Sequence, residues 1–284
     1  MDLKTVLLPI ALIIIMFGMG MTLTPADFKR VVLAPKAKLL GLFNQLLLLP
    51  LIALGLVFAF RLPGELAVGL MLIAACPGGP TSNIISHLSK GDTALSVTLT
   101  AVSSVITVFT IPLVVGAAMG HFLEADEVIA LPFVKTMLQL MIVTVLPISL
   151  GMWLHAKQPD FCSKSQRAFN LLSLLFLALV IAAAVLQEEN LGQQFRVAGP
   201  AAVALNLLTM AAGFGTAALL RLPRTQQVTI SIESGIQNGT LALGIALGIL
   251  EIPGVAIPAV VYSLLMFGSG ALMILIAPKI LNTK

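Results

Sequence analysis

Long apolar runs separated by short polar segments dominate the pattern of this chain. Nine of these runs have roughly the 20 residues that an α-helix needs to cross a hydrocarbon core. They cover residues 5–23, 38–60, 65–88, 92–119, 130–154, 168–187, 197–220, 225–250 and 255–278. Apolar residues make up 58% of the 284 positions and charged residues only 10%, against about 25% charged residues in soluble domains. The pattern therefore predicts an all-α polytopic membrane protein.

Basic residues fall unevenly on the two sides of the predicted bundle. On the side that carries the C-terminus are Lys29, Arg30, Lys36, Lys38, Lys90, Lys157, Lys164, Arg167, Arg221, Arg224, Lys279 and Lys284. On the other side are Lys4, Arg61, Lys135 and Arg196. Lys and Arg are enriched in cytoplasmic loops, so we expect a cytoplasmic C-terminus and an external N-terminus. The same asymmetry explains the pI of about 9.3 without a nucleic-acid partner. It suits a multi-pass protein of a bacterial inner (plasma) membrane.

Two of the nine runs contain residues that interrupt a helix. The third run has Cys-Pro-Gly-Gly-Pro-Thr-Ser-Asn at residues 76–83, and the eighth has Glu-Ser-Gly-Ile-Gln-Asn-Gly at residues 233–239. Proline removes a backbone donor and glycine admits non-helical dihedral angles. Pro80 suits the first position of a second half-helix, where its missing N–H costs nothing. Irregular backbone at membrane depth is tolerated only inside protein or beside a water-filled cavity. A packing kink is the alternative interpretation of each break.

The two breaks indicate an internal repeat. Aligning Asn83 with Asn238 matches spans one to four with spans six to nine and leaves the fifth span unpaired. An odd number of spans between the two units makes the repeat inverted in the membrane. Interrupted segments at corresponding positions in two halves are typical of the binding site of a secondary transporter.

Glu233 is the residue that most clearly indicates a functional site. An ionised carboxylate near the bilayer centre costs from roughly 3 to above 10 kcal/mol, and no Lys or Arg lies within eight residues of it in the sequence. Its neighbours in the sequence carry neutral oxygen atoms: Thr229, Ser231, Gln237 and Asn238. Oxygen ligands of this kind suit a small hard cation. In the fourth span Ser96, Thr100, Ser103 and Thr107 share one helical face, and the second span carries the amide pair Asn44-Gln45. The alternative for such hydroxyls is helix-to-helix hydrogen bonding.

Three stretches of the chain resemble the bile acid:sodium symporter family, called BASS. They are MFGMGMTLTPADF at residues 16–28, CPGGPTSNIISHLSKGDTALSVTLT at 76–100 and ESGIQNGTLA at 233–242. The resemblance implies a bacterial-type member with nine rather than ten helices. It also implies two broken helices that cross in a core domain, at approximately residues 38–119 and 197–280. A panel domain would comprise approximately residues 1–30 and 130–190.

The resemblance also implies two sodium sites that share Glu233. One sodium would be held by Ser82, Asn83, Ser96, Thr100 and Glu233. The second would be held by Gln45, Glu233 and Gln237 with the backbone carbonyls of Ser234 and Ile236. An organic anion would bind at the N-terminal ends of the second half-helices, beside Gly79, Thr81, Asn83, Asn238 and Gly239. The family often has a hydroxyl residue directly after the Gly-Gly pair, where this chain has Pro80.

The expected function is sodium-coupled import of an organic anion by alternating access, with two sodium ions as coupling ions and no other cofactor. A small hydroxy or oxo acid is favoured over a bile-acid-like substrate. The alternative is a proton- or potential-driven exporter of an anion or metalloid on the same fold. An intramembrane enzyme is disfavoured, because the chain has no H-E-x-x-H zinc motif and no Gly-x-Ser-x-Gly nucleophile elbow. The sequence leaves the oligomeric state open.

Overall fold

The computed structural model describes residues 3–28, 35–123, 133–187 and 191–282, and these residues are almost entirely helical. Lys29, Arg30 and Lys284 of the charge pattern lie outside the described residues, as do residues 1–2, 124–132 and 188–190. The helices are α1 (Leu3–Gly20), α3 (Pro35–Phe43), η1 (Asn44–Leu48), α4 (Leu49–Phe60), α5 (Gly64–Ala75), α6 (Pro80–Leu88), α7 (Thr93–Phe122), α8 (Phe133–Leu140), η2 (Met141–Val145), α9 (Leu146–Lys157), α10 (Pro159–Gln187), α11 (Leu191–Leu219), α12 (Arg224–Gly235), α13 (Gly239–Gly248) and α14 (Pro253–Asn282).

Helices occupy each of the nine predicted spans. Among the described residues, five helical segments are long and apolar enough to cross a membrane without interruption: Lys36–Phe60, Thr93–Phe122, Phe133–Lys157, Gly192–Leu219 and Pro253–Asn282. The third and eighth spans are divided into α5 with α6 and α12 with α13, as the glycine and proline residues predict. The prediction of an all-α polytopic membrane protein is therefore confirmed.

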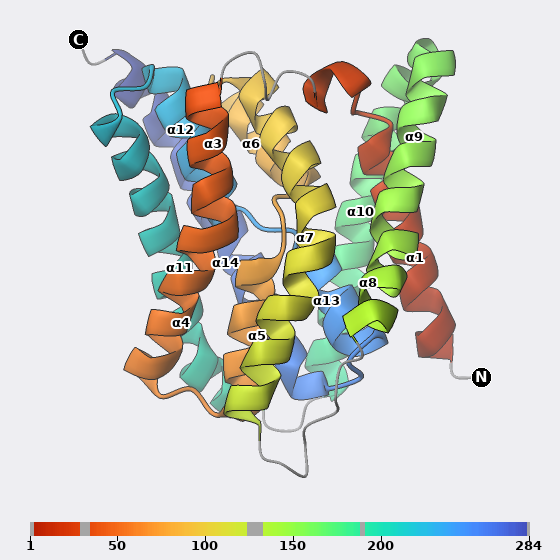
Figure 1. The fold of residues 1–284 in the computed structure, drawn as a ribbon, viewed down its shortest axis with the longest axis vertical. Coiled ribbons are helices and arrows are strands. Elements are labelled where there is room, and N and C mark those ends of the chain that lie inside the picture. The colour runs from red at the N-terminus through yellow and green to blue at the C-terminus, as the bar shows by residue number, and fades with distance from the viewer. Residues whose placement is uncertain (1–2, 29–34, 124–132, 188–190, 283–284) are drawn as a thin grey trace.

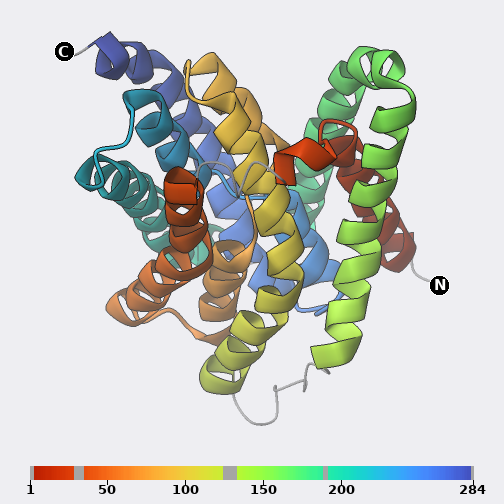
Figure 2. The same ribbon diagram turned by 45° about the horizontal axis from the view of Figure 1, so that its top comes forward.

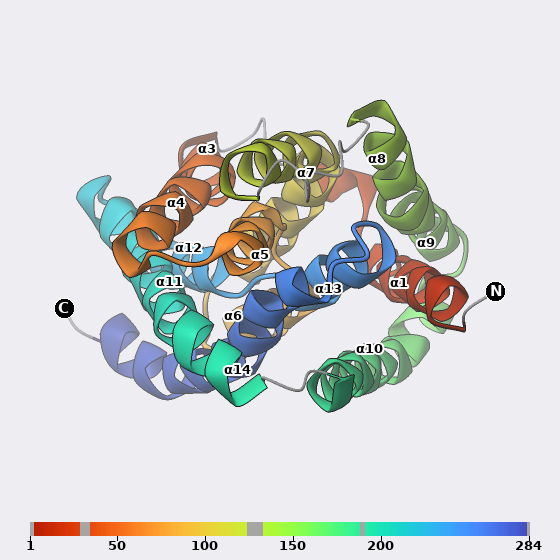
Figure 3. The same ribbon diagram turned by 90° about the horizontal axis from the view of Figure 1, so that it is seen from below.

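The helices stand side by side between two faces of the molecule (Figure 1). At the upper face in Figure 1, α6 and α9 end and α3, α10 and α12 begin. Helices α1, α9 and α10 lie together on one side, and α3, α4, α11 and α12 lie on the other (Figures 1 and 2). Seen from below, α13 lies close to α1, while α5 and α6 occupy the middle of the bundle (Figure 3).

The breaks of the third and eighth spans cross each other in the middle of the bundle. Gly78 pairs with Gln237 in an isolated antiparallel bridge, and the backbone N–H of Asn238 donates to the carbonyl of Pro77 at 2.9 Å. Backbone N–H and C=O groups without hydrogen-bond partners are costly inside a membrane protein. Here each break provides hydrogen-bond partners for backbone groups of the other. The crossing that the family resemblance implied is present.

Two helical turns of the described residues widen to the π form, and each ends two residues before a proline. The segment η1 precedes Pro50 and η2 precedes Pro147. A proline ring clashes with the carbonyl four residues earlier and gives it no hydrogen bond, so a wider turn relieves both problems. Single π turns frequently occur at functional sites, and η1 carries Gln45. The sequence interpretation did not predict this turn.

The inverted repeat has a different register from the one that the sequence alignment assumed. Gly79 is the N-cap of α6 and Asn238 is the N-cap of α13, whereas Asn83 lies one turn inside α6. The alignment of Asn83 with Asn238 was therefore wrong by one helical turn, because the second asparagine caps its half-helix and the first does not.

Left-handed residues at the helix ends support the corrected register to within one residue. Arg61 after α4 has φ 50° and Arg221 after α11 has φ 55°. Both are followed by Leu-Pro, and both helices end with the same two backbone hydrogen bonds. One joins the N–H of the leucine to the carbonyl five residues earlier, as from Leu62 to Val57 and from Leu222 to Ala217. The other joins the N–H of the arginine to the carbonyl three residues earlier. This arrangement is the Schellman motif. The repeated Arg-Leu-Pro at 61–63 and 221–223 is a sequence signal of the repeat that the sequence analysis did not use.

Candidate functional site

Glu233 lies near the end of α12, where the crossing breaks bring three other segments to its carboxylate: α7, α6 and the backbone at Gly78. The side chain is only 4% exposed. Ser96 donates to its Oε1 at 2.5 Å, and Thr100 donates to its Oε2 at 2.9 Å. These two hydroxyls lie one turn apart on α7, so one helical face presents both to the carboxylate.

Asn83 and Ser82 complete this cluster from α6. The Asn83 Oδ1 lies 2.8 Å from the Ser96 hydroxyl and 3.3 Å from the Thr100 hydroxyl. The Ser82 hydroxyl lies 3.4 Å from that of Thr100 and donates to the carbonyl of Gly79 at 2.8 Å. The structure therefore brings together all five residues of the first implied sodium site.

The cluster has more acceptor oxygens than protons to share among them. The hydroxyls of Ser96 and Thr100 each have one proton, yet each faces both a Glu233 oxygen and the Asn83 Oδ1. Two protons therefore serve four close contacts between oxygens. An oxygen-rich centre of this kind fits a small hard cation, which neutralises the carboxylate and coordinates the oxygens that lack a proton. The residues present fit sodium.

Gly78 gives the cluster its space. A Cβ at this position would lie 2.7 Å from Glu233 Oε2, 3.3 Å from Thr100 Oγ1 and 3.4 Å from Ser82 Oγ. The backbone of the break thus passes directly against the cluster, and a side chain would occupy it. Sequence reasoning used the Gly-Gly pair only as a helix break and did not assign Gly78 to the site.

The second implied sodium site is also assembled, but amide hydrogens occupy part of it. Gln45 donates through Nε2 to the carbonyl of Cys76 at 2.8 Å and to Gln237 Oε1 at 2.7 Å. Gln237 donates through Nε2 to the carbonyls of Glu233 at 3.3 Å and Ser234 at 3.0 Å. Ile236 lies in the break between α12 and α13. A cation bound here would require the Gln237 amide to turn its oxygen toward those carbonyls. Glu233 contributes its carboxylate to one cluster and its carbonyl to the other.

Other hydroxyls on α7 bond within their own helix. Ser103 and Ser104 both donate to the carbonyl of Thr100, at 3.2 and 2.7 Å, and Thr107 donates to the carbonyl of Ser104 at 3.3 Å. Hydroxyl groups commonly make this local bond inside helices. Of the four residues on the expected polar face, only Ser96 and Thr100 reach the carboxylate.

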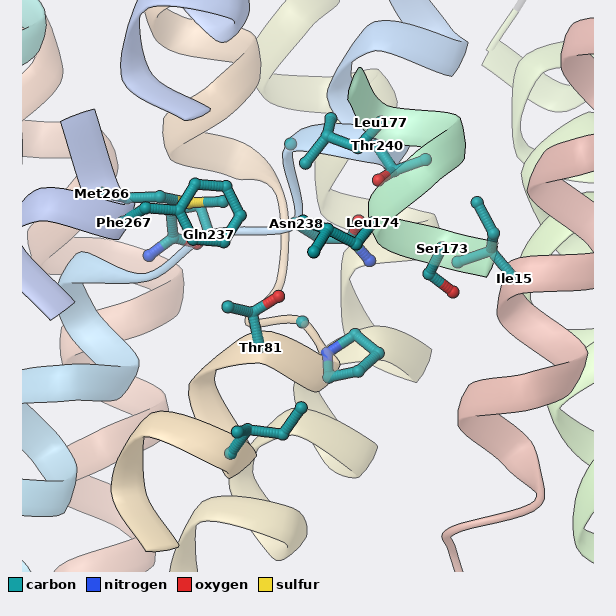
Figure 4. Close-up of a pocket in the computed structure, with 14 residues that line it drawn as sticks. Ile15, Thr81, Ser173, Leu174, Leu177, Gln237, Asn238, Thr240, Met266 and Phe267 are labelled. Atoms are coloured by element: carbon teal, nitrogen blue, oxygen red, sulfur yellow. The ribbon is translucent and has the colours of Figure 1, made fainter. Parts of the chain in front are cut away.

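A cavity lies at the N-terminal ends of both second half-helices. Its volume of about 50 Å³ has room for a few water molecules. The lining residues are Ile15, Gly79, Pro80, Thr81, Ile84, Ser173, Leu174, Leu177, Gln237, Asn238, Gly239, Thr240, Met266 and Phe267. Figure 4 shows Thr81, Asn238 and Thr240 around the space, with Ser173 and Leu174 of α10 facing them. Four of the five predicted substrate residues line it.

Asn83 is the predicted substrate residue that does not line this cavity. Its side chain faces Ser96 and Thr100 in the Glu233 cluster instead. Sequence reasoning did not predict Ile15, Ser173, Met266 or Phe267 as lining residues, because the packing of α1, α10 and α14 against the breaks is not visible in any local motif. The lone Ser173 in an apolar run was the one available signal.

The cavity lining contains no charged side chain, and one buried donor there has no partner. Asn238 caps α13 by accepting from the N–H of Leu241 through Oδ1 at 3.0 Å. Its Nδ2 is buried without a hydrogen-bond partner among the described residues. Helix N-termini favour anions through their free N–H groups and dipole. The cavity thus combines the N-termini of α6 and α13 with one unpartnered buried donor, that of Asn238.

No transition-metal site accompanies these clusters in the described part of the chain. No three side chains of His, Cys, Asp or Glu come together there in a way that could hold a metal ion. Cys76 and Cys162 are both free.

Comparison with known proteins gives a family. Residues 9–194 match the model of the sodium bile acid symporter family. The chain is 32% identical over 261 residues to a protein of Bacillus subtilis (strain 168) named "Uncharacterized sodium-dependent transporter YocS", covering 92% of this chain and 79% of that protein. It is 30% identical over 275 residues to "Probable sodium/metabolite cotransporter BASS2, chloroplastic" of Oryza sativa subsp. japonica, covering 96% of this chain and 64% of that protein.

A human relative extends the comparison. The chain is 32% identical over 243 residues to "Sodium/bile acid cotransporter 4" of Homo sapiens, covering 83% of this chain and 54% of that protein. The chain thus spans between about half and four fifths of the length of these relatives. Its family consists of transporters rather than enzymes, and its helices are those of a multi-pass membrane protein. This protein is a member of the sodium bile acid symporter family.

Proposed function

We propose that this protein imports a small organic anion together with sodium, by alternating access. The observation that carries the proposal is the proton-deficient oxygen cluster around Glu233. One sodium ion binds Ser82, Asn83, Ser96, Thr100 and Glu233. A second sodium ion binds Gln45, Glu233 and Gln237 with the carbonyls of Ser234 and Ile236. The names of the relatives, which refer to sodium-dependent transport and cotransport, support sodium as the coupling ion.

The anion binds in the neutral cavity, beside the cation clusters. Gly79, Thr81, Asn238 and Gly239 line it, while Asn83 serves the cation side. Gln237 both lines the cavity and donates to the Ser234 carbonyl of the second cluster. Sodium binding therefore fixes a side chain that the anion touches, which couples the two ligands. The small volume of the cavity favours a hydroxy or oxo acid over a bile acid.

The transport cycle moves a core domain against a panel domain. The core comprises approximately residues 38–119 and 197–280 and contains the crossing breaks. The panel comprises approximately residues 1–30 and 130–190, from which Ile15 and Ser173 reach the cavity. A cavity lined from both domains opens to one face or the other when they shift. With the C-terminus cytoplasmic in an inner membrane, uptake runs from the lower to the upper face of Figure 1.

Sodium-dependent thermal stabilisation of the purified protein in detergent tests the cation site. A ligand that binds only the folded state raises its stability by about 2.7 kcal/mol at a concentration of 100 times its Kd. We expect sodium, but not potassium, to raise the melting temperature of the wild type. Glu233→Gln should abolish this rise, whereas Glu251→Gln, which removes a carboxylate from an exposed turn, should keep it.

Equal stabilisation by sodium and potassium in the wild type would overturn sodium coupling. Transport that follows a pH gradient without sodium would then support the exporter alternative. With the sodium effect established, the same assay identifies the substrate. Small oxo and hydroxy acids are added in saturating sodium, and a genuine substrate raises the melting temperature further only when sodium is present.

A further inference from the structure

Helices α6, α7 and α12 all extend to the upper face of the molecule (Figure 1). The turn between α6 and α7 packs directly on α12. The backbone N–H of Asp92 donates to the carbonyl of Thr225 at 3.3 Å, and the Thr229 hydroxyl donates to the carbonyl of Asp92 at 3.3 Å. The three helices therefore remain in contact from the cluster to the surface.

Each of the three helices continues the polar character of the cluster toward that face. We call the set of residues beyond the cluster the oxygen ladder: Ser86, Ser89, Asp92, Gln226 and Thr229. Ser86 follows Ser82 on one face of α6 and Ser89 caps the end of that helix, at the spacing that aligns helical side chains. Asp92 lies one turn before Ser96, and Thr229 lies one turn before Glu233.

Two members of the oxygen ladder are buried without partners. The hydroxyls of Ser86 and Ser89 have no hydrogen-bond partner among the described residues, and both side chains are 0% exposed. Serines inside helices usually bond to a carbonyl of their own helix, as Ser104 and Ser234 do here. A buried polar group left unbonded costs about 1–3 kcal/mol. Apolar packing therefore does not account for these two hydroxyls.

The ladder ends at a carboxylate on the surface side. Asp92 is half-buried and caps α7 by accepting from the N–H of Leu95 through Oδ1 at 3.0 Å. Its Oδ2 accepts from Gln226 at 3.3 Å. Between this carboxylate and Ser86 the backbone comes close at Gly91, where a Cβ would lie 2.6 Å from Thr229 Oγ1 and 3.2 Å from the Ser86 carbonyl. Near the surface the oxygens of Thr229, Asp92 and Ser86 thus lie close together, and Ser86 and Thr229 are each one helical turn from the cluster residues Ser82 and Glu233.

We propose that the oxygen ladder is the route by which sodium passes between the Glu233 cluster and the upper face of the protein. Ser86, Ser89 and Thr229 offer successive oxygen ligands to the partly dehydrated ion, and the Asp92 carboxylate attracts cations at the mouth. The route rests on the proposed sodium site but is a separate statement, because the site can bind sodium at equilibrium whichever way the ion leaves. The organic anion leaves from its own cavity on the other side of the breaks.

Paired substitutions at Ser86 and Ser89 test the route. Valine and threonine have nearly the same shape, so Ser→Val and Ser→Thr add the same bulk but only threonine keeps the oxygen. The full-length protein is immobilised in detergent, loaded with radioactive sodium and chased with unlabelled sodium in a rapid-filtration experiment. Removing one ligand from the path should slow release by about tenfold, a factor that corresponds to about 1.4 kcal/mol. The Thr variants should release sodium at close to the wild-type rate.

Controls separate the route from the site. Sodium-dependent thermal stabilisation should be unchanged in all four variants, since none of them alters a residue of the two clusters. Ile85→Val changes a buried neighbour on α6 that packs toward Gly270 of α14, and it should leave release unchanged. Absence of sodium-dependent stabilisation in the wild type would refute the proposed function itself. Equal release rates in the Val and Thr variants would refute the route alone.

Asp92→Asn provides a variant that does not change the interior. Asparagine caps helices as well as aspartate does, so α7 should remain intact. Loss of the negative charge at the mouth should slow sodium binding severalfold at low ionic strength and have little effect at high salt, where charges are screened. A binding rate that is independent of the Asp92 charge at low salt would contradict the placement of the mouth.

Discussion

Gln45 and Asn206 make the same hydrogen bond in the two halves of the molecule. Gln45 Nε2 donates to the carbonyl of Cys76 at 2.8 Å, and Asn206 Nδ2 donates to the carbonyl of Gly235 at 2.7 Å. Cys76 is the residue directly after α5, and Gly235 is the last residue of α12, so both carbonyls lie at the end of the first half-helix of their repeat. A buried amide on the preceding span thus satisfies the terminal carbonyl in both breaks.

The two halves then differ in what surrounds this shared bond. In the second half Tyr262 also donates to the Gly235 carbonyl, at 2.9 Å, so that carbonyl accepts two hydrogen bonds. In the first half Gln45 bonds not only to the Cys76 carbonyl but also to the side chain of Gln237 in the other break. One repeat therefore has a firmly held break, and the other has the amide that belongs to the candidate cation cluster.

A double-mutant cycle tests the clamp on Gly235. Tyr262→Phe should lower the free energy of unfolding by at most about 1 kcal/mol, because Asn206 still satisfies the carbonyl. Asn206→Ala should cost more, since it also removes buried volume. The double variant should lose about 1 kcal/mol more than the sum, because the carbonyl then has no partner. The free energies of unfolding for the cycle are measured in mixed micelles. As a control, the changes caused by Tyr262→Phe and by Ser149→Ala on distant α9 should add in the double variant.

Much of the fold could be predicted from the sequence because lipid imposes simple rules on it. Apolar length gave the nine spans, and the Pro-Gly and Ser-Gly interruptions gave the two breaks. The register of the repeat was not recoverable from matching asparagines, because Asn83 lies inside α6 and Asn238 caps α13. The repeated Arg-Leu-Pro would have given it to within one residue, since Arg61 and Arg221 both end a helix in the left-handed conformation.

The candidate site was predictable where a residue type is conspicuous in its surroundings. Glu233 and Gln45 stand out in apolar runs, and the structure brings them into one network. Gly78 was missed because its role is the absence of a side chain beside Glu233, which only the crossing of the breaks reveals. Ser173 and Phe267 were missed because they reach the cavity from helices far away in the sequence.

The two adjacent glycines of the first break provide a matched pair of variants. Gly78→Ala places a methyl group 2.7 Å from Glu233 Oε2, whereas Gly79→Ala meets nothing closer than Asn238 Cα at 3.5 Å. We expect Gly78→Ala to weaken the sodium-dependent rise in melting temperature by an amount equivalent to at least about tenfold in Kd. Gly79→Ala should preserve it. A normal sodium response in Gly78→Ala would contradict the proposed position of the first sodium ion.

Gln45 should distinguish one bound sodium ion from two. Gln45→Leu removes a ligand of the second cluster and leaves the first cluster unchanged. The Hill coefficient for sodium cannot exceed the number of sites, so we expect a value above one in the wild type and about one in the variant. Sodium titrations followed by thermal stability give both values. Asn44→Leu is the control, because the neighbouring Asn44 bonds to Thr216 of α11 at 2.8 Å rather than to either break. An unchanged Hill coefficient in Gln45→Leu would contradict the proposal of a second sodium site at Gln45.

Asn238 should separate anion binding from sodium binding. Its Oδ1 caps α13, while its buried Nδ2 beside the cavity has no partner among the described residues. Asn238→Asp keeps the shape and the capping oxygen but replaces the free donor with negative charge. A carboxylate at a helix N-terminus is favourable, so the fold and the sodium-dependent stabilisation should persist. The further stabilisation by an organic anion should be lost, because the new charge repels it. Asn238→Ser, which keeps a cap without the charge, should weaken anion binding less. If Asn238→Asp still responded to the anion as the wild type does, the anion would have to bind away from the N-terminus of α13.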